Sequence, residues 1–159
     1  MLRNKIALSA SGFVAGVALT LASVGSTVSP ASAQMSSDQA YMVAQKAQVA
    51  ATTFQLDNAK LHDIEEQSKA GTIVPGALGY VRRARIAAQA TEWPEGLKPM
   101  ATTLVADMKT LEEAIRTEDA AKVVEPAGKV HEGGHDLSAA VYTWLDTGKA
   151  PEAGHEHSH

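Results

Sequence analysis

Apolar residues in this chain recur at spacings of three and four from about residue 36 to about residue 146, not at alternate positions. That period places them on one face of a helix, so the pattern predicts an all-α protein. Four helices follow from it, over about residues 36–69, 75–92, 99–115 and 117–146. The buried stripe of the first predicted helix is centred on Phe54 and consists of Val43, Ala47, Ala50, Phe54, Leu61 and Ile64.

Residues that start and stop helices lie at the ends of these segments. Ser36 or Ser37 is suited to cap the first helix, Gly71 follows its end, and Pro75 fits the first turn of the second helix. Pro126 lies inside the fourth segment, where it removes a backbone donor and clashes with the preceding turn. We therefore expect the fourth helix to be kinked or divided there.

The predicted domain organisation has three parts. Short connections make neighbouring helices antiparallel, so residues 34–148 are predicted to form an up-down-up-down four-helix bundle. Residues 1–33 are predicted to be a cleaved signal peptide, because a positively charged start and a largely apolar run precede the small residues Ala-Ser-Ala. An uncleaved N-terminal anchor is the alternative. Residues 149–159 are rich in Pro, Gly, His and Glu and predict a flexible tail.

The charge and the cysteine content narrow the possible partners. Cleavage after Ala33 would remove Arg3 and Lys5 and no acidic residue, which changes the formal net charge from −4 to −6. This acidic balance argues against nucleic acid and anionic membranes as partners and is favourable for cations. The chain contains no cysteine, so an exported form would depend on packing and not on disulfides for its stability.

Two histidines of the fourth predicted helix lie one turn apart. His131 and His135 enclose Glu132 and two glycines, so the stretch reads His-Glu-Gly-Gly-His. This spacing occurs in zinc hydrolases, where the two imidazoles bind the metal and the glutamate acts as general base. The sequence after His135 lacks the glycine and third histidine of the longer metzincin motif. The glycines Gly133 and Gly134 disfavour a helix, so they require either a closely packed neighbouring helix or room for a ligand.

Polar residues of different helices are expected to meet in one layer of the bundle. With Phe54 at the centre of the buried face, four polar residues of the first helix fall at inward or boundary positions. They are Asp57, Asn58, His62 and Glu65. Antiparallel pairing brings them near the height of His131, and Arg85 of the second helix faces inward at a similar height. The segment 99–115 is expected to place almost no polar residue on its inner face.

This polar layer has two interpretations. The first is a purely structural network, in which Arg85 pairs with Asp57 or Glu65 and a histidine completes the hydrogen bonds. The second is a transition-metal site that bridges the first and fourth helices. Its predicted ligands are His62, Glu65, His131, His135 and Asp57. Imidazole and carboxylate groups at inward positions of a helical bundle form sites for Cu(II), Ni(II) or Zn(II).

The end of the chain adds a separate group of histidines. His155, His157 and His159 alternate with polar residues, a composition that captures divalent transition metals. Together these features predict a secreted or periplasmic helical bundle that binds such a metal for buffering or handling and catalyses no reaction. Stable membrane insertion after cleavage is not expected. The alternatives are a structural or protein-interaction bundle without metal and a zinc hydrolase that uses His131, Glu132 and His135.

Overall fold

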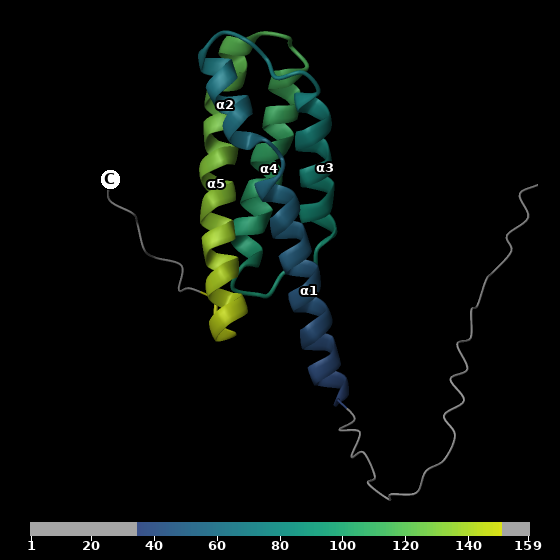
Figure 1. The fold of residues 1–159 in the computed structure, drawn as a ribbon. Helices are drawn as coiled ribbons and strands as arrows, with labels where there is room; N and C mark the ends of the chain where they lie inside the picture. The colour runs from purple at the N-terminus through teal and green to yellow at the C-terminus, as the bar shows by residue number, and fades with distance from the viewer. Residues whose placement is uncertain (1–34, 151–159) are drawn as a thin grey trace, which may run out of the picture. The chain divides into compact units, whose positions relative to one another are not determined.

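The computed structural model describes residues 35–150, and that part of the chain contains five α-helices and no strand (Figure 1). The helices are α1 Ser37–Asp57, α2 Leu61–Lys69, α3 Ala77–Ala90, α4 Lys98–Ile115 and α5 Ala120–Thr147. An all-α, four-helix arrangement is thereby confirmed, with α1 and α2 together in the place of the first predicted helix. No helix of the described part is both long and apolar enough to cross a lipid bilayer. The predicted signal peptide and the histidines of the tail lie outside the described residues.

The prediction of one continuous helix from residue 36 to residue 69 is wrong, because the chain leaves the helix after Asp57. The side-chain amide of Asn58 donates to the Phe54 carbonyl (2.7 Å), and Lys60 adopts the left-handed conformation with φ 57°. Leu56 and Leu61 are both buried. Five residues of continuous helix would separate them by about 140°, so one straight helix could not bury both. The break lets each half present its own apolar face.

The predicted centre of the buried stripe is also wrong. Phe54 is 69% exposed, whereas Val49 and Leu56 are almost fully buried. The two buried residues lie seven apart, so they share one face of α1, and Phe54 lies about 140° from Val49. The buried face of α1 is therefore rotated away from the predicted one, and this rotation changes which of its polar side chains reach a neighbour.

Helix α5 occupies a central place in the bundle, since it packs against α4, α2 and α1. Helix α3 completes the packing by contacting α4 and α1. Large apolar side chains fill the space between these helices and are almost fully buried. They are Leu56, Ile64, Leu97, Leu104, Met108, Leu111, Leu137, Val49, Val81, Val123, Val130 and Val141. The burial of these side chains removes apolar surface from water and is the main term that stabilises the folded bundle.

Local signals set the ends of the helices. Ser36 and Gln39 form a reciprocal capping box at α1, and Asp119 accepts a hydrogen bond from Ala121 at the start of α5. Gly148 ends α5 in the left-handed conformation. Pro126 does not divide α5, which continues across it with one backbone hydrogen bond fewer. The second predicted helix begins later than expected, since α3 starts at Ala77 and leaves Pro75 outside its first turn.

Candidate metal centre

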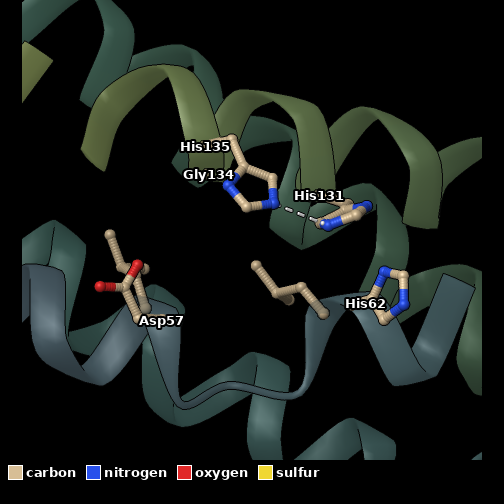
Figure 2. A pocket seen from close by; sticks show the side chains of 7 residues that line it. Asp57, His62, His131, Gly134 and His135 are labelled. Atoms are coloured by element: carbon tan, nitrogen blue, oxygen red, sulfur yellow. Dashed lines mark hydrogen bonds between the residues drawn. The ribbon is translucent and has the colours of Figure 1, made fainter. Parts of the chain in front are cut away.

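A hollow of about 210 Å³ lies where α5 passes the break between α1 and α2 (Figure 2). Two of its side chains, His131 and His135, come from α5, and Asp57 and His62 come from the two sides of the break. The full lining is Leu56, Asp57, Leu61, His62, His131, Gly134 and His135. The structure therefore brings four of the five predicted bundle ligands to the wall of one hollow.

The fifth predicted ligand, Glu65, contacts His131 from outside that wall. Its Oε2 lies 2.5 Å from His131 Nδ1, and its Oε1 lies 2.7 Å from Lys69 Nζ. The hydrogen bond from Lys69 lowers the pKa of Glu65 most strongly, burial opposes this change, and His131 lowers the pKa further. An ionised carboxylate only accepts hydrogen bonds, so the Nδ1 of His131 is the donor.

The tautomer of His131 follows from this contact. Because Nδ1 carries the hydrogen of the neutral ring, Nε2 keeps an unshared electron pair. That atom lies 2.9 Å from the Nε2 of His135, which must then donate its own hydrogen to it. The ring of His62 is also close, with its centroid 5.1 Å from that of His131. Figure 2 shows the His131 and His135 rings turned toward each other at the mouth of the hollow.

Glycines in α5 allow α2 and α4 to come close. A Cβ added to Gly134 would lie 3.3 Å from Leu61 Cδ1, and one added to Gly133 would lie 3.5 Å from Leu104 Cδ1. One turn earlier, a Cβ at Gly128 would lie 3.6 Å from Glu65 Oε1. A closely packed neighbouring helix therefore accounts for Gly134, whereas the space beside Gly133 would accept a methyl group at ordinary contact distance.

Asp57 forms the opposite side of the hollow and already has two donors. Its carboxylate accepts hydrogen bonds from the hydroxyls of Ser138 (2.9 Å) and Tyr142 (3.2 Å). The charge of Asp57 and this hydrogen bond raise the pKa of Tyr142, with a further contribution from desolvation. Ser138 and Tyr142 lie four residues apart on α5, so they hold the end of α1 against α5. Sequence reasoning missed both, although Ser138 follows His135 by three residues and Tyr142 follows it by seven, spacings that keep them near the same face of α5.

Arg85 is absent from this hollow, which corrects the predicted polar layer. Its Nε lies 2.5 Å from Glu112 Oε1 on α4, and Arg116 and Arg82 lie 3.1 and 3.5 Å from the other oxygen of Glu112. The side chain of Glu112 is 3% exposed, so the expectation that segment 99–115 carries almost nothing polar on its inner face is wrong. Burial raises the pKa of Glu112, but the hydrogen bonds and charges of Arg85 and Arg82 outweigh it and lower the pKa overall.

The general base that a zinc hydrolase would need does not face the hollow. Glu132 is exposed and is not among the residues that line it. The space beside Gly133 and Gly134 is occupied by leucines of α4 and α2. Within residues 35–150, no three His, Asp or Glu side chains already converge as a complete set of metal ligands.

No protein-family model, no curated protein and no solved structure matches this chain.

Proposed function

We propose that this protein is a secreted or periplasmic metal-handling bundle that binds a divalent transition-metal ion between His131 and His135. The proposal includes an up-down-up-down course of the chain, with α1 and α2 as its first arm. In this arrangement α5 supplies the two imidazoles, and the α1–α2 break supplies the opposite side of the hollow. The protein would buffer or carry the ion, with no reaction of its own.

The observation that supports this proposal most is the separation of the two Nε2 atoms. They lie 2.9 Å apart. A metal ion binds imidazole nitrogen at about 2.0–2.1 Å, and two such bonds at a right angle place their nitrogens about 2.9 Å apart. An ion could therefore bind both nitrogens at this separation once the rings turn so that each Nε2 electron pair points at the ion and not at the other ring. His135 needs only to transfer its hydrogen from Nε2 to Nδ1, a change of tautomer that leaves the ring neutral.

The contact between Glu65 and His131 has a role in this proposal that differs from the predicted one. Metal-binding histidines usually donate their other ring N–H to a carboxylate, which fixes the tautomer and makes the ring a stronger ligand. Glu65 holds the Nδ1 of His131 in that way and is itself held by Lys69. We therefore assign Glu65 as a positioning residue and not as a ligand.

The right angle between the two imidazole bonds favours a metal with tetragonal geometry. Two imidazoles at a right angle suit Cu(II) or Ni(II), whereas tetrahedral Zn(II) requires a wider separation. His62 is the nearest further imidazole, and Asp57 lies across the hollow, where a water molecule could link it to the ion. Because Cu(II) forms the most stable complexes of the divalent first-row metals, we expect the order Cu(II), Ni(II), Zn(II) in affinity.

Isothermal titration of the purified protein with these three metals tests the proposal. The titration uses a variant in which His155, His157 and His159 are all replaced by alanine, so that the tail histidines cannot bind the metal. We expect this variant to retain one Cu(II) site and to lose it when His131→Ala is added. Glu132→Gln is the matched control, because Glu132 is exposed beside His131 and faces away from the hollow. Absence of binding once the tail is changed would contradict the proposal and favour a purely structural or interaction bundle.

A further inference from the structure

The first turns of α1 carry an apolar face that the bundle leaves uncovered. Met42, Val49 and Leu56 are spaced by seven residues and so lie along one face of the helix. Val49 and Leu56 are buried in the bundle, whereas Met42 is 41% exposed. No residue of α1 before Val49 is buried. Figure 1 shows these first turns standing apart from the other helices.

A shallow, open groove lies along this uncovered face. Its lining is Met35, Asp38, Gln39, Met42, Val43 and Lys46. Met35 and Val43 are 55% and 56% exposed. Exposed methionines and valine in a continuous groove are unusual for a surface that contacts only water. An isolated helical segment of this length is also only marginally stable, so contact with another surface would stabilise it.

The charges on this segment indicate which surface fits the groove. Between residues 35 and 49 the only charged side chains are Asp38 and Lys46. They lie four residues before and four residues after Met42. If two copies of the segment pair antiparallel about Met42, Asp38 of each copy lies level with Lys46 of the other. A parallel pair would instead place Asp38 beside Asp38 and Lys46 beside Lys46, which is repulsive.

We propose that a second copy of this chain covers the groove, in an antiparallel, two-fold symmetric pair with Met42 at its centre. Such an interface is self-complementary, as in most homodimers. Lys46 is already positioned for it, because its Nζ donates to the Leu145 carbonyl (2.9 Å) and lies over the Trp144 ring. An ammonium group has three N–H donors, so donors remain for Asp38 of the second copy.

The interface involves one short helix face from each copy, so we expect a reversible dimer whose population rises with protein concentration. None of the residues that line the groove lines the hollow between His131 and His135. The dimer therefore does not depend on metal binding. Adding a chelator keeps the two effects apart, because it removes any pairing of copies through a shared ion.

Sedimentation velocity of the purified protein with chelator, over a wide concentration range, tests the proposal. We expect a monomer–dimer equilibrium, and we expect Met42→Glu to raise its dissociation constant by at least about a hundredfold, since two carboxylates would meet at the centre. Phe54→Glu is the matched control, because Phe54 is an exposed apolar residue (69%, against 41% for Met42) on a different face of α1. A monomer at every concentration, or a dimer that Met42→Glu leaves unchanged, would overturn the proposal.

A charge exchange tests the antiparallel arrangement and does not depend on the behaviour of the Met42 variant. Asp38→Lys alone should raise the dissociation constant by about tenfold, because it replaces two attractive pairs with two repulsive ones. Adding Lys46→Glu to the same chain should restore most of the affinity. Failure of the second change to restore dimerisation, with helix content unchanged by circular dichroism, would rule out this pairing.

Discussion

Two glutamates of this bundle, Glu112 and Glu65, contact charged or hydrogen-bonding side chains. The difference between their surroundings separates a structural network from the candidate metal site. Glu112 contacts Arg85, Arg82 and Arg116, and its side chain is almost fully buried. All of these partners carry fixed charges and offer only hydrogen-bond donors, so the cluster presents no electron pair on a ring nitrogen to a metal ion. It joins α3 to α4 and has a structural role.

Glu65 has the same kind of carboxylate but a different effect on its neighbour. It occupies the Nδ1 of His131 and leaves the Nε2 of that ring facing a hollow. Guanidinium groups offer only donors, whereas an imidazole held at one nitrogen presents an electron pair at the other. If the proposed function holds, the partner of the carboxylate, more than its burial, determines whether a polar cluster can bind a metal.

Removing the carboxylate of Glu112 should have the largest effect on stability. Glu112→Gln leaves Arg85 without its charged partner between α3 and α4, so we expect the free energy of unfolding to fall by about 3 kcal/mol. Urea denaturation followed by circular dichroism measures this change. Glu113→Gln is the control, because Glu113 is adjacent and exposed. A loss below about 1 kcal/mol would mean that the cluster is no stronger than a surface ion pair.

Acid should remove the same stabilisation without a mutation. The arginines hold the folded-state pKa of Glu112 below its ordinary value of 4.5, although burial raises it. The unfolded chain therefore takes up this proton first, and the contribution is fully present above about pH 4.5 and is lost as the pH falls through the folded-state pKa. The difference in stability between wild type and Glu112→Gln should be constant at neutral pH and should shrink in acid. A difference that grows in acid would contradict this assignment.

Removing the carboxylate of Glu65 should act mainly on metal binding. We expect Glu65→Gln to weaken Cu(II) binding by about tenfold and Glu65→Ala to weaken it by nearer a hundredfold, because the amide still accepts a hydrogen bond and the methyl group does not. Titration calorimetry in the background without tail histidines measures both. Glu66→Gln is the control, since Glu66 also contacts Lys69 but is exposed. Equal losses in the Glu65 and Glu66 variants would show that Glu65 does not position His131.

The smallest expected effects distinguish the two glycines of α5. Alanine favours a helix over glycine by about 1 kcal/mol, and the space beside Gly133 accepts a methyl group at ordinary contact distance. Gly133→Ala should therefore raise the free energy of unfolding by up to about 1 kcal/mol. Gly134→Ala should gain less, because Leu61 has to move. Thermal unfolding of the two variants compares them directly, and a larger gain at Gly134 would contradict the close approach of α2.

Features that depend on local sequence were predicted well. The starts and ends of α4 and α5 lie close to the predicted positions, because capping residues and prolines act within one turn. His131 and His135 lie on one face for the same reason, since their spacing alone determines it. Four of the seven residues that line the hollow, Asp57, His62, His131 and His135, were also predicted as ligands, because helical phase and antiparallel pairing placed them near one height.

Features that depend on how helices are rotated against each other were not predicted. The break after Asp57 had a signal, since Asp-Asn favours a turn and Leu56 and Leu61 are five residues apart. Without the break, the buried face of the first helix was misplaced. The pairing of Arg85 with Glu112 requires the rotation of α3 against α4, which no residue of either helix specifies alone. Sequence patterns therefore predicted which side chains lie at the site but not which partner each side chain contacts.

The break between α1 and α2 also affects how fast a bound ion could leave. Helix α2 has nine residues, and among the helices its main packing partner is α5. A helix this short detaches by local opening at a lower free energy than unfolding of the whole bundle, so its amide hydrogens should exchange faster than those of α4. His62 and Glu65 both lie on α2. If the ion binds as proposed, each opening of this short helix would remove His62 and the Glu65 contact of His131 and so speed the loss of the ion, while His131 and His135 stay on the folded α5.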